Sequence, residues 1–242
     1  MSGHSLMGAA PCRTLLCRTL PCRTLGRRSV LGLGMGAAAL LAAGPARAQA
    51  IPPSGQLAFD IIRGGSRIGH ETVTFQQSGS RLTVFVEVSI RVTMAMITVY
   101  RLHHHETETW DGGQILSFAA TTQKNGRNFY AQGWRVNETF MVRGTAHPDG
   151  YQAPPGALPT SQWNHAMLNG PMINTQDARL MHPTVTAEGE TKVALADGSD
   201  IPALCFKARG DLHFDTYFSD SWEWVGLSFR AEDGSVVTYE KL

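Results

Sequence analysis

The chain has 242 residues, with 21 Lys and Arg against 20 Asp and Glu and a formal net charge of +1 at pH 7. The charges are unevenly placed: residues 1–48 hold six arginines and no acidic residue, so residues 49–242 hold 15 basic and 20 acidic side chains, a net charge of −5. A mildly acidic domain without a basic stripe is unsuited to bind nucleic acid, and we expect no nucleic-acid partner.

Residues 1–48 have the three parts of an export signal: a basic segment, an apolar run and a small-residue cleavage site. The basic part ends in the pair Arg27-Arg28, and the run closes with Ala46-Arg47-Ala48. The paired arginines resemble the twin-arginine signal, with general secretion as the alternative. The run is too short and too Gly-rich for a membrane span. We predict cleavage before Gln49, passage through one of these export machineries, a periplasmic location and no stable membrane span after cleavage.

Residues 49–242 fit a single domain with a full core. Within them Cys205 is the one cysteine, which excludes an internal disulfide. Alternating apolar and polar segments, separated by turns rich in Gly, Asn and Asp, predict antiparallel strands. They are residues 56–63, 67–77, 81–92, 97–110, 114–123, 128–136, 138–144, 184–195, 201–210, 211–219, 222–230 and 235–242.

Roughly ten to twelve consecutive strands predict an all-β fold: an antiparallel barrel, a half-barrel or a strongly curved sheet. Residues 145–183 interrupt the pattern. Within them Ser161 is suited to cap a short helix over residues 162–168, which Asn169 and Gly170 would end. The Trp, Met, Leu and Ile content of this insertion argues against disorder. We expect an ordered, lid-like segment with one short helix.

Several motifs resemble a family of exported bacterial proteins known only as a domain of unknown function. They are "RGGSRIGHETVTF", "ITVYRL", "SQWN", "NTQDARL", "GDLHFDTYF" and "DGSVVTYEKL", which together extend over residues 57–242. The chain departs from the family pattern at Ala178, where glycine is more frequent. The resemblance implies a mostly antiparallel β domain in the periplasm and brings no catalytic residue.

The stretch "YRLHHHETETW" raises the possibility of a metal site. In a strand, His104, Glu106 and Glu108 share one face, and His103 and His105 share the other. Imidazole and carboxylate groups suit zinc or copper, so His104 and Glu106 are metal-ligand candidates. A metal site needs further ligands from neighbouring strands, and the favoured interpretation is a polar strand that lines a wet cavity or faces solvent.

Two further stretches contain ligand-binding candidates. In "DLHFDTYFSD", an Asp-His-Asp row on one strand face is suited to orient a general base or to bind a cation, although any half-exposed strand shows this alternation. In "WNHAMLNGPMINTQD", a tryptophan and several amides are suited to a sugar or lipid head group, or they simply cap turns. The candidates are Trp163, Asn164, Asn174, Thr175, Gln176, Asp177, Asp211, His213 and Asp215.

Common catalytic and cofactor motifs are absent from the sequence: there is no G-x-S-x-G, phosphate loop, dinucleotide fingerprint, H-E-x-x-H or C-x-x-C. We therefore predict no cofactor and leave enzymatic activity undecided. The favoured function is binding or carriage of a small apolar or amphipathic, lipid-like ligand. The alternatives are an exported hydrolase or metal-dependent enzyme whose site is assembled across strands, and an envelope assembly factor.

Overall fold

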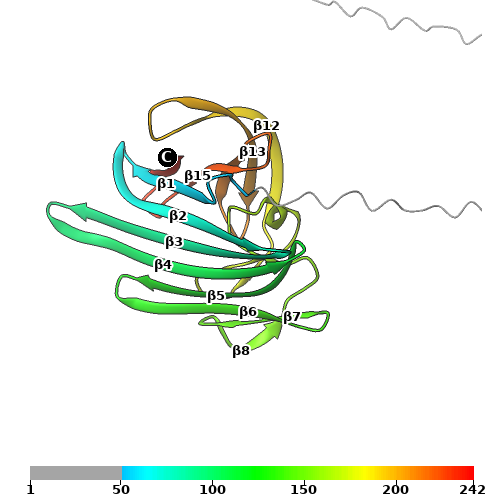
Figure 1. Cartoon of the computed structure of the whole chain (residues 1–242). Helices are drawn as coiled ribbons and strands as arrows, with labels where there is room; N and C mark the ends of the chain where they lie inside the picture. Colours follow the sequence, from blue (N-terminus) through cyan, green and yellow to red (C-terminus); the bar gives the residue numbers. More distant parts are fainter. Residues whose placement is uncertain (1–50) are drawn as a thin grey trace, which may run out of the picture. The chain divides into compact units, whose positions relative to one another are not determined.

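The computed structural model describes residues 51–242. The predicted export signal, its arginine pair and the cleavage site before Gln49 lie outside the described residues. Within residues 51–242 the chain forms one large antiparallel sheet of 13 strands and a small sheet of three (Figure 1). The large sheet is strongly curved and is not closed, since its edge strands β12 and β8 are not paired with each other. The predicted all-β fold class is confirmed in the form of a curved sheet.

Twelve of the 13 strands of the large sheet follow the predicted segments within a few residues, and β8 was not predicted. The 13 strands are β1 (Gln56–Arg63), β2 (Ser66–Ser78), β3 (Arg81–Met94), β4 (Ile97–Asp111), β5 (Gln114–Lys124), β6 (Arg127–Val136), β7 (Thr139–Gly144), β8 (His147–Gln152), β12 (Thr184–Ala194), β13 (Asp200–Arg209), β14 (Phe214–Phe218), β15 (Trp224–Arg230) and β16 (Val236–Lys241).

The path of the chain explains how the sheet curves around an interior. The chain starts at β1 in the middle of the sheet, and successive hairpins lead outward to the edge strand β8. It then crosses to the other edge strand, β12, and returns through hairpins to β16, which pairs with β1. The Ala196 N–H, just after β12, donates to the Lys241 carbonyl of β16 at 3.0 Å, so this half of the sheet is tightly curled.

The crossing is made by residues 153–183, which we call the cover segment. It contains β9 (Leu158–Pro159), the 3₁₀ helix η1 (His165–Asn169), β10 (Met172–Ile173) and β11 (Leu180–Met181). The irregular segment is shorter than the predicted residues 145–183, because β8 pairs with β7 as part of the large sheet.

The prediction that Ser161 caps the short helix is wrong. The helix starts at His165, and the Asn164 side chain caps it by accepting from the Ala166 N–H at 3.1 Å. Ser161 lies too early in the chain for this role, and its hydroxyl instead contacts carboxyl groups of β4. The predicted helix end at Asn169 and Gly170 is confirmed.

The core lies between the concave face of the large sheet and the cover segment. Its largest fully buried side chains include Trp110, Trp163, Trp224, Phe59 and Phe218. In residues 51–242 no helix has the length and apolar character needed to cross a bilayer.

A close approach between β7 and the cover segment explains why Ala178 is an unusual residue at its position. Ala178 is fully buried and has a φ of 71°, a left-handed conformation that favours glycine. Its Cβ faces Gly144, where an added Cβ would lie only 2.5 Å away. The added Cβ would also lie 2.5 Å from the Tyr130 carbonyl oxygen and 2.9 Å from that of Asp177, so Gly144 has to remain glycine whichever residue stands at 178.

Candidate ligand-binding cavity

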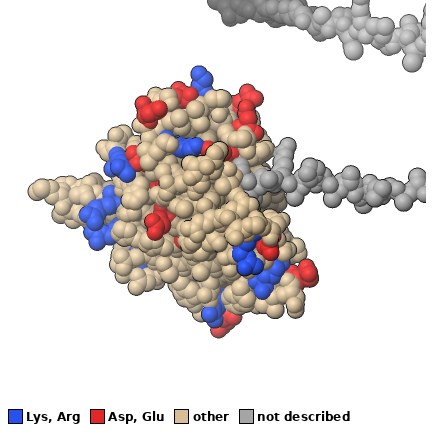
Figure 2. All heavy atoms as spheres, viewed as in Figure 1, with Lys and Arg blue, Asp and Glu red and all other residues tan. Residues whose placement is uncertain are grey.

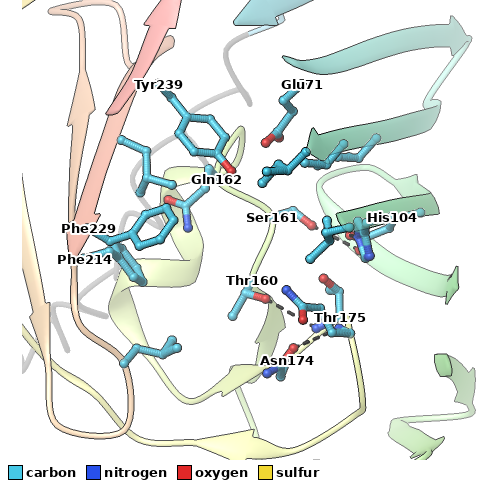
Figure 3. Close-up of a pocket in the computed structure, with 18 of the residues that line it drawn as sticks. Glu71, His104, Thr160, Ser161, Gln162, Asn174, Thr175, Phe214, Phe229 and Tyr239 are labelled. Carbon is cyan, nitrogen blue, oxygen red and sulfur yellow. Dashed lines mark hydrogen bonds and ion pairs between the residues drawn. The ribbon is translucent and has the colours of Figure 1, made fainter. Parts of the chain in front are cut away.

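A cavity of about 370 Å³ lies inside the curve of the sheet. One wall comes from β2, β3 and β4, the opposite wall comes from β14, β15 and β16, and the cover segment lies between them (Figure 3). Half of the wall residues are aliphatic or aromatic: Val86, Val88, Ile90, Tyr100, Leu102, Trp163, Leu212, Phe214, Leu227, Phe229 and Tyr239. Polar side chains come mainly from the cover segment, with Glu71, His104, Glu106 and Lys124 from the strands and His213 from just before β14.

Two buried carboxyl groups of β4 bind the cover segment. The Ser161 hydroxyl lies 3.2 Å from Glu106 Oε1 and also contacts Glu108 Oε1. A hydroxyl carries one hydrogen, so both contacts are satisfied when Ser161 donates to Glu106 and a protonated Glu108 donates to Ser161. Burial, and then the nearby Glu106, raise the pKa of Glu108 well above its usual value. Burial also raises the pKa of Glu106, to about 7.

Two tryptophans complete the environment of Glu108. The indole N–H groups of Trp110 and Trp163 donate to Glu108 Oε2 at 2.8 Å and 3.1 Å. The two rings also meet edge to face, with centroids 5.6 Å apart. Glu108 is therefore a fully satisfied buried group that links β4 to the cover segment, and it does not line the cavity.

His104 is a neutral, hydrogen-bonded member of the cavity wall. Its Nδ1 lies 2.8 Å from the Thr122 hydroxyl and its Nε2 lies 3.3 Å from Glu106 Oε2. Burial lowers the pKa of His104 to about 4, so the imidazole is uncharged at neutral pH. Because both ring nitrogens have protein partners, His104 orients Glu106 and is not poised to activate Ser161.

Among the polar groups of the cavity, the buried Gln162 Oε1 has no hydrogen-bond partner within residues 51–242. Glu71 and Tyr239 have none there either. They come from β2 and β16, and both point into the cavity (Figure 3). Each is more than nine-tenths buried, at 7% exposure, yet neither side chain forms a hydrogen bond within residues 51–242. Burial, and then the charge of Glu106, raise the pKa of Glu71 to about 8. The cavity therefore presents a protonated carboxyl and a phenol, both able to donate a hydrogen bond to a molecule inside it.

Comparisons with known proteins agree with this fold. A family model described as a domain of unknown function, DUF6134, matches residues 59–241. The chain belongs to the DUF6134 family. The predicted resemblance to a domain of unknown function is confirmed. A search of curated proteins found no match.

Among solved structures, the DUF6134 chain is similar to a crystal structure from Brucella abortus. That structure is described as a beta-barrel-like protein of the domain of unknown function DUF1849. The match has 10% sequence identity and a TM-score of 0.54, and it covers 77% of this chain and 94% of that chain. At this identity the similarity shows the fold alone.

Some of the predicted site residues of this DUF6134 domain meet at the cavity. Trp163, Asn174, Thr175 and Gln176 of the cover segment line it, together with His213. The two metal-ligand candidates, His104 and Glu106, also line it. Within residues 51–242, no group of three or more His, Cys, Asp and Glu side chains is placed to hold a metal ion.

The other candidates have structural contacts outside the cavity. Asn164 caps η1, and Asp177 accepts from the Arg179 side chain at 2.8 Å. Asp211 accepts from the His182 N–H at 2.8 Å, and Asp215 forms an ion pair with Arg209 at 2.6 Å. The predicted strand over residues 211–219 begins only at Phe214, so the Asp-His-Asp row does not share one strand face. Of that row, His213 alone lines the cavity.

Sequence reasoning missed Glu71 and Tyr239 as site residues. The alternation of buried and exposed residues along their strands could have identified both. Glu71 is in phase with the buried Val73 and Phe75, and Tyr239 is in phase with the buried Val237. A carboxyl group in the apolar phase of a strand predicts burial, and therefore an unusual environment.

Proposed function

We propose that this DUF6134 domain binds a small amphipathic molecule in the cavity between the two halves of its curved sheet. The observation that supports this proposal most directly is that the buried side chains of Glu71 and Tyr239 point into the cavity without a protein hydrogen-bond partner. Buried polar groups almost always have hydrogen-bond partners, and here the described protein supplies none. A ligand with a polar end would supply them, while its apolar part would contact the aliphatic and aromatic walls.

The dimensions and chemistry of the cavity support this proposal. Its volume of about 370 Å³ falls within the range of roughly 300–1,000 Å³ that is usual for small-molecule sites. Such sites combine apolar walls with a few convergent polar groups. Since Glu71 has a pKa of about 8 and His104 is neutral, Glu71 is mainly a hydrogen-bond donor at neutral pH, while Glu106, with a pKa of about 7, is about half ionised. This environment favours a hydrogen-bond acceptor on the ligand.

We also propose that the domain acts in the periplasm after export. The support is the sequence of residues 1–48, with its arginine pair, apolar run and Ala-Arg-Ala site. A domain that carries a lipid-like molecule between membranes would be needed in such an aqueous compartment.

The binding proposal is tested by fluorescence titration with a fluorescent fatty acid as the probe. Glu71→Met with Tyr239→Phe keeps side chains of similar size but removes both hydrogen-bond donors, the protonated carboxyl and the phenol. We expect an affinity loss of about tenfold or more, because a hydrogen bond from each group to the ligand is lost. Tyr130→Phe, on the exposed face of β6, is the matched control. Equal affinity for all three proteins would overturn the proposal.

Acid–base catalysis is a second candidate, favoured by the raised pKa values of Glu71 and Glu106 in one cavity. A serine nucleophile is not supported, because the His104 nitrogens contact Thr122 and Glu106 rather than Ser161. Mass spectrometry of lipid esters and glycosides after incubation with the protein separates the two functions. Turnover that Glu71→Gln abolishes would favour the enzyme, whereas stoichiometric recovery of an unchanged molecule would favour the carrier.

A further inference from the structure

The hairpin between β3 and β4 projects beyond the rest of the sheet. β3 pairs with β2 only as far as Ile90, and β4 pairs with β5 only from Leu102 onward. Residues 91–100 therefore form a two-stranded ribbon beyond the pairing with β2 and β5, and Arg101 at its base bonds through its backbone to Asn125. Figure 1 shows this hairpin extending past the adjacent hairpins on the same side of the sheet.

The end of this ribbon is apolar and exposed. Met94, Met96, Ile97 and Val99 have exposures of 62%, 95%, 67% and 48%. In Figure 2 the tip is a narrow tan projection with Lys and Arg atoms behind it. We call residues 94–99 the apolar tip. Large exposed apolar side chains grouped at one end of a domain indicate an interaction site.

The turn inside the apolar tip has an unfavourable sequence for its backbone. Ala95 and Met96 have φ values of 47° and 64°, the two left-handed residues of a type I′ turn. The β5–β6 hairpin makes the same kind of turn with Asn125 and Gly126, the residues this turn prefers. Folding alone would thus favour Asn-Gly at the apolar tip as well. The methionine makes the tip more apolar at a cost in stability.

Positive charge lies directly behind the apolar tip. Arg91 and Arg101 are cross-strand partners on the exposed face, and within residues 51–242 neither forms an ion pair. Like charges directly opposite each other are destabilising unless an anion lies between them. Lys124 lies beside the ribbon, over the Tyr100 ring.

The inner face of the ribbon leads to the cavity. A trough of about 450 Å³ is lined by Met94, Val99, Val92 and Ile90, among others. Glu232 and Asp233 border it from the β15–β16 turn, and Asp233 is paired with Arg63. Trough and cavity share four lining residues: Ile90, Tyr100, Lys124 and Phe229. The trough and the cavity therefore adjoin at these four side chains, three of which are apolar or aromatic.

We propose that the apolar tip docks into an anionic lipid bilayer, with Arg91 and Arg101 on the lipid phosphates, and that the trough passes an amphipathic lipid between bilayer and cavity. The second half of this inference rests on the proposed binding function. A bilayer fits the tip better than a protein partner, because a stable protein interface needs about 800 Å² on each partner, more than a narrow two-stranded tip offers. Shallow insertion of a few apolar side chains beside basic residues is typical of peripheral membrane binding.

The docking half is tested by co-sedimentation of the full chain with vesicles of phosphatidylglycerol and phosphatidylethanolamine. The decisive variant is Ala95→Asn with Met96→Gly, which suits the type I′ turn and so preserves the hairpin. We expect its partition coefficient to fall about tenfold, since an exposed apolar side chain is lost. Arg91→Gln with Arg101→Gln should lower it by about fivefold per arginine at low salt, with less effect at high salt.

All variants keep residues 1–50, so any contribution of that segment is the same in each. Val136→Ser, an exposed apolar residue on β6, is the matched control and should sediment like the wild type. Equal sedimentation of the wild type and the tip variants would overturn the docking proposal.

A separate measurement distinguishes failure of docking from failure of ligand binding. Tip variants should bind a monomeric fluorescent fatty acid with wild-type affinity, yet extract a fluorescent phospholipid from vesicles more slowly than the wild type. Glu71→Met with Tyr239→Phe should show the reverse: normal sedimentation and weak monomer binding. Normal extraction by the tip variants would contradict the transfer path even where the cavity binds ligand.

Discussion

Glu71 and Glu106 make the stability of this domain depend on pH. Burial raises their pKa values to about 8 and about 7, so the folded protein retains protons that the unfolded chain releases near pH 4.5. Above pH 4.5 the unfolded chain binds fewer protons than the folded protein, and the free energy of unfolding falls as the pH rises. His104, whose pKa is lowered to about 4, has the opposite effect below pH 6.5.

The clearest window therefore lies between pH 6.5 and pH 8. Across it we expect the free energy of unfolding to fall by on the order of 1–3 kcal/mol, because the two carboxyls lose their protons in a buried site. Urea denaturation at several pH values measures this slope. Glu71→Gln with Glu106→Gln should flatten it, whereas Glu190→Gln, on the exposed edge strand β12, should leave it unchanged. A wild-type stability that is constant or rises over this window would contradict the buried, protonated state.

Trp163 holds the cover segment through a hydrogen bond as well as through packing. Trp163→Phe keeps an aromatic ring near Phe75 and Trp110 but removes the N–H that reaches Glu108. We expect the free energy of unfolding to drop by about 1–3 kcal/mol, since a buried carboxyl group loses a donor. Trp134→Phe, on a ring that is 37% exposed, should change it by less than about 0.5 kcal/mol. Equal effects from the two substitutions would mean that the Glu108 contact contributes little.

Residue types alone could not identify the cavity. The alternation in β4 correctly predicts that His104, Glu106 and Glu108 point one way and the exposed His105 the other. It does not tell which residues from other strands face them. Glu71 of β2 and Tyr239 of β16 both reach the cavity because their strands lie on either side of β1 in the sheet. The pairing of β16 with β1, which brings distant parts of the sequence together, sets this arrangement.

At the scale of single elements, the β3–β4 turn combines an unfavourable backbone with an exposed apolar surface. Ala95→Asn with Met96→Gly should raise the free energy of unfolding by about 1 kcal/mol, because two left-handed positions receive residues that tolerate them. Thermal unfolding measures this gain. The opposite substitution at the β5–β6 turn, Asn125→Ala with Gly126→Met, should lower the free energy of unfolding. A loss of stability in the first variant would show that the turn residues make contacts that the structure does not contain.

The strands were predictable because each antiparallel strand contacts the core on one face only, which gives a period of two. The cover segment was harder to predict. Its shortest strands, β9, β10 and β11, have two residues each and no periodicity. Ser161 precedes a helical stretch and matches a cap by residue type, but tertiary contacts with Glu106 and Glu108 determine its role. The strand β8 was missed because "HPDGYQ" contains Pro and Gly, which usually mark turns.

For the molecule as a whole, the continuity of three features supports a carrier. An apolar tip with basic residues behind it borders a trough, the trough adjoins a cavity, and the cavity contains polar groups that lack protein partners. The curvature of the open sheet allows this arrangement, because strands from its two halves lie on opposite sides of the cavity. The similarity to a beta-barrel-like structure supports the fold without indicating a ligand.

The most direct test is native mass spectrometry of the protein purified gently from its own cells, before and after denaturation. We predict an added mass, that of a small amphipathic molecule, which denaturation removes. It should be reduced in Glu71→Met with Tyr239→Phe and unchanged in Tyr130→Phe. A bare chain that remains bare after incubation with a lipid extract of the same cells, or a bound mass that is identical in all three proteins, would contradict ligand binding in the cavity.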